Sequence, residues 1–265
     1  PAFEMARTSL QDISISGITK GWAGLDNFAT LLANPELPGI LIRTITWVAV
    51  VVSVTIVISL ALAQLLNAAF PGRRFVRWAL IVPWAAAVVM TATIWTWMLD
   101  GFSGIINRIL FDLGLVDSYI IDWLGDPSTS FIWLMVVAIF VSLPFSTYVF
   151  LAGLQAIPGD IYEAARVDGA DGWRQYRDIT LPLLKPALLV ASIINMINVF
   201  NSFPIIWVMT GGGPGFTTDT TTTFMYKLAF SFQDIGQSAA MAVINFGVIL
   251  VFVVAYLRVV NWRQA

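Results

Sequence analysis

Cysteine and histidine are absent from this 265-residue chain, and charged residues are scarce, with 14 Lys and Arg and 16 Asp and Glu. Without histidine or cysteine there is no imidazole base, no thiolate nucleophile, no usual zinc or haem ligand, and no disulfide. A net charge of −2 also argues against nucleic acid as a partner. The composition therefore favours a protein without catalytic residues and without a metal site.

Apolar residues, in contrast, make up 58% of the chain, and the mean hydropathy is +0.82. Five runs contain no charged residue, and each is long enough to cross a bilayer's hydrocarbon layer, which needs roughly 20 residues in a helix. Trimmed to their apolar parts, the runs predict spans at 44–66, 78–98, 131–153, 187–209 and 236–257. The predicted fold class is all-α, a polytopic bundle of transmembrane helices.

Basic residues divide unequally between the connections that join these spans. Nine of the 14 Lys and Arg lie in 67–77, 154–186 and the tail from 258, whereas the alternate connections, which include 1–43, hold the other five. Because basic loops remain in the cytoplasm, the carboxyl terminus is expected inside and the amino-terminal segment outside. An external amino-terminal segment implies one further span before Pro1, so we expect a six-span core.

The connection 99–130, expected outside, contains an amphipathic stretch. Five apolar side chains share one helical face there: Ile105, Ile106, Ile109, Leu110 and Leu113. They predict a short helix that either rests at the membrane surface or packs as a cap over the bundle. No repeat or low-complexity linker interrupts the chain, so residues 1–265 are expected to form a single transmembrane domain.

The most informative stretch is the expected cytoplasmic loop 154–186, which holds nine of the charged residues. Pro158 predicts the start of a short helix, and Gly169 permits a sharp reversal, because glycine tolerates left-handed backbone angles. A second short helix is expected at 173–179, after which Pro182 returns the chain to the membrane. Two short helices around a glycine corner can seat in a groove on a partner. From the residues alone, an ordinary hydrated loop is the alternative.

Fixed spacings in this loop identify a family. Glu-Ala-Ala at 163–165, Gly169, Ile179 and Leu-Pro at 181–182 match the signature loop of the membrane subunits of ATP-binding-cassette (ABC) importers. The resemblance implies a permease subunit with the type I ABC importer fold, in which 154–186 is the coupling loop that docks in a cleft on an ATPase subunit. The residues assigned to coupling are Glu163, Ala164, Ala165, Asp168, Gly169, Ile179, Leu181 and Pro182.

The same resemblance implies partners and a location. The partners are a second homologous permease subunit, two cytoplasmic ATPase subunits that bind ATP and Mg, and an extracytoplasmic solute-binding protein or lipoprotein. The location is the plasma (inner) membrane of a prokaryote. The phosphate-binding pattern Gly-x-x-x-x-Gly-Lys-Ser/Thr is absent from this chain, so ATP hydrolysis is expected in the partners and no cofactor is expected here.

A second region of the sequence indicates which class of solute is transported. The run from Thr210 through three glycines to Pro214, followed by Thr217, resembles the maltose-type and glycerol-phosphate-type permeases of the carbohydrate-uptake branch. A sugar site should combine amide or hydroxyl groups with aromatic faces. Pro144 is expected to open the helix beside that site. The substrate path carried over by position from the maltose-type family is Ser142, Phe145, Asn198, Asn201 and Ser202.

The predicted function is thus the import of an oligo- or disaccharide or a sugar derivative. Asn195, Asn198 and Ser202 share one face of their span, but helix–helix hydrogen bonding explains such residues equally well. A permease for a non-sugar solute, such as an amino acid or phosphate, is the alternative. An ion-coupled secondary transporter is disfavoured because the charge-free runs contain no ionisable coupling residue. Tryptophans near predicted span ends, Trp47 among them, are interpreted as interfacial anchors.

Overall fold

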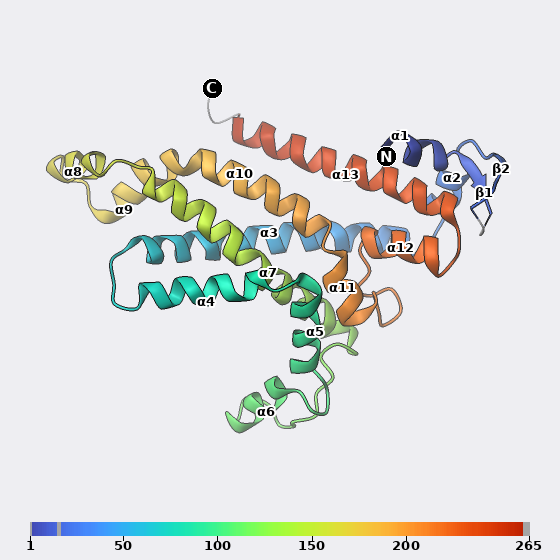
Figure 1. Cartoon of the computed structure of the whole chain (residues 1–265), viewed down its shortest axis with the longest axis horizontal. Helices are drawn as coiled ribbons and strands as arrows, with labels where there is room; N and C mark the ends of the chain where they lie inside the picture. Colours follow the sequence, from blue (N-terminus) through green and yellow to red (C-terminus); the bar gives the residue numbers. More distant parts are fainter. Residues whose placement is uncertain (1, 15–16, 262–265) are drawn as a thin grey trace.

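The computed structural model describes residues 2–14 and 17–261, and these form the predicted helical membrane bundle (Figure 1). Within the described residues, four helices are long and apolar enough to span a membrane: α3 (Leu37–Asn67), α7 (Pro127–Gln155), a helical stretch over Gly172–Thr210, and the Ile235–Arg258 part of α13 (Ile235–Asn261). At about 1.5 Å per residue, each exceeds the roughly 30 Å of the hydrocarbon layer.

Among the described residues, strands occur only in the amino-terminal segment. It consists of α1 (Ala2–Thr8), an antiparallel hairpin of β1 (Gln11–Ile13) and β2 (Thr19–Trp22), and α2 (Asp26–Leu32). The Asn27 side-chain amide donates to the carbonyls of Ser9 (2.9 Å) and Gln11 (3.0 Å). A Cβ on Gly236 would lie 2.7 Å from the Asn27 amide, so the bare glycine lets α13 begin directly against this segment.

Three helices form the centre of the bundle: α3, α7 and α10 (Leu181–Phe200), each packed against the other two. An apolar cluster at mid-length includes Trp47, Leu134 and Val199, and a second cluster near the coupling loop includes Leu66, Phe150 and Leu184. In the second cluster a Cβ on Gly153 would stand 2.7 Å from the Leu184 side chain and 2.8 Å from Ala187. The glycine therefore lets α7 and α10 touch closely where they leave the membrane.

Two of the five predicted spans contain a helix break. The predicted span 187–209 still lies within the candidate span Gly172–Thr210, whereas no described helix of spanning length covers 78–98. The predicted span 78–98 is divided between α4 (Arg73–Ala85) and α5 (Val88–Met98), which turns away from the bundle (Figure 1). The predicted span 187–209 is divided between α10 and α11 (Phe203–Thr210). Pro204 lies in the first turn of α11 and lacks an N–H, so the carbonyl of Phe200 receives no helical hydrogen bond and the helix ends. For α4 and α5, packing of α5 against α11 outweighs the helix preference of an alanine run.

Pro144 behaves oppositely to the expectation. It lies buried inside α7, and the helix continues through it without a break. Close packing against α3 supports the helix here, and the Ser59 hydroxyl of α3 donates to the carbonyl of Leu143 at 3.3 Å. A proline's missing hydrogen bond is tolerated in a membrane helix when neighbouring helices supply compensating contacts.

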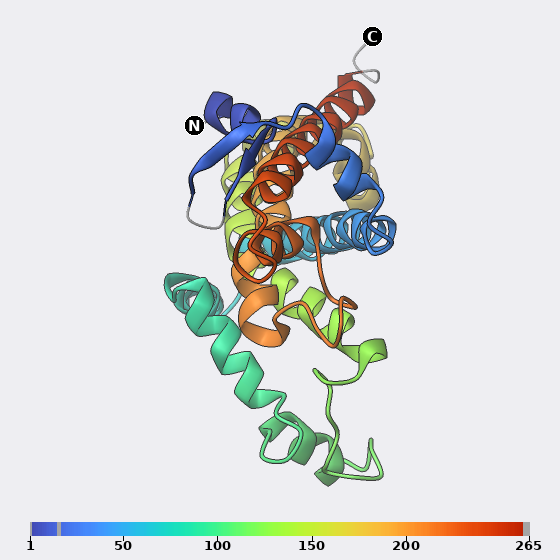
Figure 2. The ribbon, with the colours of Figure 1, turned by 90° about the vertical axis from the view of Figure 1, so that its right-hand side faces the viewer.

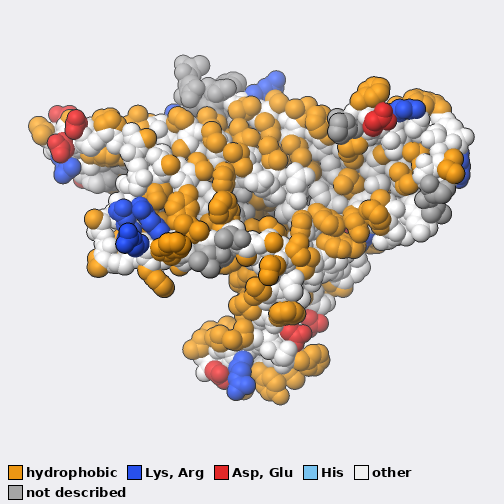
Figure 3. Space-filling model, in the orientation of Figure 1, with side chains coloured by type: hydrophobic (Ala, Val, Ile, Leu, Met, Phe, Trp, Pro, Cys, Tyr) orange, Lys and Arg blue, Asp and Glu red, His pale blue; other side chains and the backbone are white. Residues whose placement is uncertain are grey.

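The predicted amphipathic helix in 99–130 is confirmed as α6 (Ile105–Asp112). Figures 1 and 2 agree that α6 lies at the far end of α5, away from α3, α10 and α13, so it does not cap the bundle. Ile105, Ile109 and Leu113 are exposed on it. In Figure 3, hydrophobic side chains cover much of the bundle's visible face, and the charged groups gather at its ends and on this projecting arm.

Candidate functional site

The loop 154–186, to which the sequence assigns coupling, folds into a compact projection that we call the knob, formed by α8 (Gly159–Val167), α9 (Gly172–Gln175) and the π-helical turn η1 (Tyr176–Thr180). Gly169 has a φ of +77° and forms the corner. Its N–H donates to the Arg166 carbonyl (3.1 Å), and the N–H of Ala170 donates to the Ala165 carbonyl (2.9 Å). These two bonds form a Schellman motif, which ends α8 and places glycine at the left-handed position. The predicted glycine corner is confirmed.

The residues assigned to coupling occupy different surroundings in the knob. Glu163, Ala164, Asp168 and Gly169 are exposed, and Val167 beside them is 88% exposed. Ala165, in contrast, is buried within the knob, so its small side chain serves packing inside this chain and not the close approach of a partner. Ile179 and Leu181 are half-buried, and Pro182 is exposed at the start of α10.

The second short helix of the knob was predicted as a separate element at 173–179, and this prediction was wrong. The helix continues from α9 through η1 into α10. In η1 the helix widens, and the N–H of Leu181 donates to the carbonyl of Tyr176, five residues earlier. Pro182 follows at once and lacks an N–H. A widened turn accommodates this proline without breaking the helix.

A cavity of about 330 Å³, lined by both apolar and uncharged polar side chains, lies where the two helix breaks meet α7. Trp84 of α4 and Val88 of α5 flank one break, and Ser202 and Pro204 flank the other. The structure thus brings together every predicted residue of the substrate path, because the cavity lining includes Ser142, Phe145, Asn198, Asn201 and Ser202. None of the described residues that line it is ionisable.

The break between α10 and α11 is held by side-chain hydrogen bonds. The Asn201 amide donates to the Ile197 carbonyl (2.9 Å), and the Ser202 hydroxyl donates to the Val199 carbonyl (2.6 Å). The Trp47 indole N–H of α3 donates to the same Val199 carbonyl (2.9 Å) and to the Ser202 hydroxyl oxygen (3.0 Å). Trp47 is 1% exposed, so its interpretation as an interfacial anchor was wrong, and it fixes the wall of the cavity instead.

Asn195 was left out of the predicted substrate path, yet it lines the same cavity. The residue is 2% exposed, and its side-chain Nδ2 has no hydrogen-bond partner among the described residues. An unpaired buried amide costs about 1–3 kcal/mol, so the bundle retains this donor at a cost in stability. In the sequence, Asn195 lies on the same helical face as Asn198, and this position could have identified it as a residue of the cavity.

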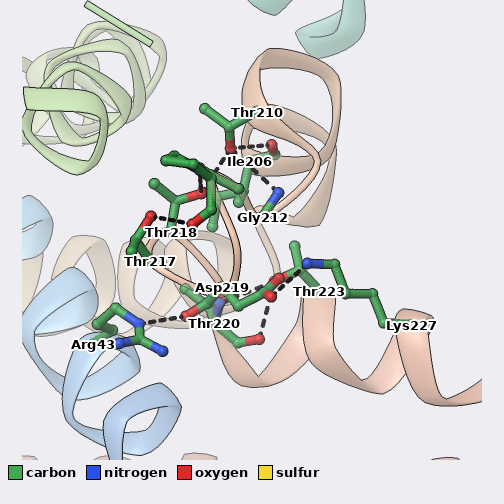
Figure 4. A network of polar contacts seen from close by, with 12 residues as sticks. Arg43, Ile206, Thr210, Gly212, Thr217, Thr218, Asp219, Thr220, Thr223 and Lys227 are labelled. Carbon is green, nitrogen blue, oxygen red and sulfur yellow. Dashed lines mark hydrogen bonds and ion pairs between the residues drawn. The ribbon is translucent and has the colours of Figure 1, made fainter. Parts of the chain in front are cut away.

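The glycine-rich turn after α11 is anchored by a polar network (Figure 4). Asp219 is fully buried, and its carboxylate accepts a hydrogen bond from the Lys227 ammonium of α12 (Thr221–Phe230) at 2.6 Å. The Arg43 guanidinium of α3 donates to the Asp219 backbone carbonyl at 3.2 Å. Thr210 and Thr218 join the two ends of the turn through their hydroxyls at 2.8 Å. The turn is therefore tied to α3, α11 and α12 together.

Electrostatics at Asp219 reflect this burial. Desolvation raises the pKa of the carboxyl, while hydrogen bonds from Lys227 and Thr223 and the charges of Lys227 and Arg43 oppose the rise.

At two exposed aspartates of the 99–130 connection the pKa is lowered instead of raised. Hydrogen bonds from Ser103 and Phe102 lower the pKa of Asp100, and hydrogen bonds from Ser128 lower that of Asp126, which caps α7.

Comparison with known proteins gives concordant results. The family model described as "Binding-protein-dependent transport system inner membrane component" matches residues 55–263. The trehalose/maltose transport system permease protein of Thermococcus litoralis is 36% identical over 248 residues, covering 92% of this chain and 82% of that protein. The sulfoquinovosyl glycerol transport system permease protein of Agrobacterium fabrum is 33% identical over 265 residues, covering 100% of this chain and 85% of that protein.

The fold also matches a solved structure. A chain in the crystal structure of a bacterial ABC transporter involved in the import of the acidic polysaccharide alginate superimposes with a TM-score of 0.84. The two chains are 23% identical, and the match covers 98% of this chain and 88% of the other. At this identity the likeness establishes a shared fold.

Proposed function

Because this chain belongs to the family of binding-protein-dependent transport system inner membrane components, we propose that the solute its importer carries is a sugar. The chain itself is a multi-pass inner-membrane permease of a binding-protein-dependent ABC importer and is not catalytic; in this family ATP is bound by a partner ATPase. The family also removes the ion-coupled secondary transporter from the alternatives. The solute and the roles of individual residues are what the proposal adds.

The observation that carries the proposal is the composition of the 330 Å³ cavity. Three asparagines and two serines supply donors and acceptors, Phe145 and Trp84 supply aromatic faces, and no described lining residue is ionisable. Such a lining suits a neutral polyol, whose hydroxyls both donate and accept while its ring carbons pack on aromatic faces. An amino acid or phosphate would leave its charge without a partner. The Thermococcus litoralis relative is named for trehalose and maltose, which are neutral sugars and agree with this choice. The Agrobacterium fabrum relative is named for a sugar derivative that carries a sulfonate, so it supports a sugar but not its neutrality.

The assembly we propose follows the family resemblance. A second homologous permease subunit completes the translocation path, and an extracytoplasmic binding protein delivers the sugar to the side that holds 99–130 and 210–235. Two cytoplasmic ATPases dock on the knobs of the two permeases. In this arrangement the carboxyl terminus is cytoplasmic, although Arg263, one of the basic residues behind that assignment, lies outside the described residues.

The proposal is tested with the complete transporter in proteoliposomes and a solute panel of maltose, trehalose, glutamine and inorganic phosphate. We expect ATP-dependent accumulation of a sugar, and retention of the same sugar by the purified binding protein. Accumulation of glutamine or phosphate in place of both sugars would refute the sugar assignment, while the assignment of the chain to its family would still hold.

Asn195→Leu provides a test within the cavity. Leucine has a similar size and removes the unpaired amide, so thermal stability should be kept or should rise, while sugar uptake should fall about 10-fold through the lost ligand hydrogen bond. Differential scanning fluorimetry and initial uptake rates measure the two effects. Asn245→Leu is the matched control, because Asn245 is also a buried asparagine but does not line the cavity. Equal uptake by Asn195→Leu and the unmodified protein would exclude a ligand role.

A further inference from the structure

A hydrogen bond joins the two sides of the knob. The hydroxyls of Tyr162 in α8 and Thr180 at the end of η1 lie 2.9 Å apart. The Thr180 hydroxyl donates its hydrogen to the Gln175 carbonyl at 3.2 Å, so the Tyr162 hydroxyl is the donor to Thr180. Thr180 is 4% exposed, so this bond is largely shielded from competing water. We call the Tyr162–Thr180 pair the clasp.

The clasp joins α8 to α10 directly, whereas the backbone joins them only through the corner and α9. Along the chain, α8 connects to α10 through the left-handed corner at Gly169 and then through α9. Asp171 caps the amino end of α9, because its carboxylate accepts a hydrogen bond from the Arg174 N–H (2.7 Å). The corner at Gly169 is held by its two Schellman bonds and by the Gln175 side-chain amide, which donates to the Ala170 carbonyl (2.8 Å), but none of these bonds reaches α10. Through space, in contrast, the clasp ties α8 directly to the foot of α10.

The position of Thr180 gives the clasp a mechanical consequence. Thr180 lies at the junction between the widened turn η1 and α10, two residues before Pro182. The other end of α10 carries Asn195 and Asn198 into the 330 Å³ cavity. Twenty helical residues span about 30 Å, so a displacement at Thr180 reaches the cavity as a movement of one rigid rod.

We propose that Tyr162 and Thr180 are positioning residues for transport, because their hydrogen bond joins α8 and α10 into one lever that carries movement of the knob to the cavity. This inference rests on the proposed coupling role of the loop 154–186. When ATP binding draws the two ATPases together, α8 moves with its ATPase, and the clasp makes α10 follow. Without the clasp, movement of α8 is absorbed by rotation at Gly169.

The test follows both ends of the lever and needs no knowledge of the solute. This sequence has no cysteine, so pairs of introduced cysteines can carry spin labels when the partner subunits are also free of reactive cysteine. Val57→Cys with Val190→Cys reports the position of α10 against α3, and both sites are exposed. Val57→Cys with Asp160→Cys reports the position of α8. Distances are measured by pulsed electron paramagnetic resonance in the assembled transporter, with and without ATP and vanadate.

In the otherwise unmodified protein we expect both distances to change with ATP. In Tyr162→Phe and in Thr180→Val, which each remove one hydroxyl, the α8 distance should still change, while the fraction of molecules with a shifted α10 distance should fall about five-fold. Thr180→Ser keeps the hydroxyl and should restore the shift. Because the two hydroxyls act as a pair, the double variant should be no worse than either single one.

Tyr176→Phe is the matched control, since it removes a hydroxyl from the same knob that has no hydrogen-bond partner among the described residues. An unchanged α10 shift in both Tyr162→Phe and Thr180→Val would overturn the proposal. So would an equal loss in Tyr176→Phe, since that would indicate a general effect on the knob. If neither distance changes with ATP in the unmodified protein, the coupling role itself fails, which is a distinct outcome.

Discussion

Replacing Gly169 by valine is expected to reduce ATP-driven uptake strongly while the permease still inserts and assembles. Gly169 holds a φ of +77°, and no atom lies within 4 Å of the position that a Cβ would take, so the penalty is one of backbone conformation. A left-handed residue with a Cβ costs about 1–2 kcal/mol, and a β-branched residue costs more. That lowers the population of the correctly turned knob by at least about 5–30-fold. Initial uptake rates in proteoliposomes should fall by a similar factor.

Gly172→Ala is the control for this effect. Gly172 belongs to the same knob, also has open space around its Cβ position, and begins α9 outside the left-handed region. Alanine favours a helix there, so uptake should be retained. Co-purification of the ATPases measures docking in each variant. Full uptake by the valine variant would show that the corner at Gly169 is not needed for coupling.

A second large effect is expected from Gly212→Ala in the external turn. A Cβ at this position would stand 2.6 Å from the Asp219 Cγ and 2.7 Å from the Lys227 Nζ, and φ is already +84°. The substitution therefore forces the buried ion pair apart, and breaking such a pair costs about 3–5 kcal/mol. We expect a strong loss of thermal stability of the purified permease, together with loss of uptake.

Gly211→Ala separates the backbone penalty from the collision. Gly211 also has a positive φ, of +60°, but no atom lies within 4 Å of its Cβ position. It should cost about 1–2 kcal/mol, and the melting temperature should fall much less than in Gly212→Ala. Equal losses in the two variants would mean that the contact with Asp219 and Lys227 carries no weight.

The parts of the fold that the sequence predicts well are those that depend on local composition. Charge-free runs locate α3, α7 and α13, and a glycine in the coupling loop locates its corner. The resemblance to the maltose-type family also identifies Ser142, Phe145 and Asn201, and these three residues line one cavity in the structure. The assignment of these residues to the path of a solute stays a prediction.

The features that could not be predicted depend on contacts between distant segments. A hydropathy run cannot distinguish a straight span from one that bends. Pro204 ends α10 locally, but the break between α4 and α5 depends on packing of α5 against α11, and the shape of the α10–α11 break is held by the hydrogen bonds of Trp47. Pro144, which looked like a break, is held in a continuous helix by α3. Asn195 and Thr180 are similar cases, because burial decides their importance and burial is a property of the packed bundle.

The uncharged lining of the cavity has a consequence for energetics. A membrane voltage does work on charge, at roughly 2.3 kcal/mol per elementary charge and 100 mV. A neutral solute that passes an uncharged cavity moves no charge across the membrane, so the voltage neither drives nor opposes its entry. If the solute is a neutral sugar, as we propose, its accumulation against a gradient should be insensitive to a potassium diffusion potential.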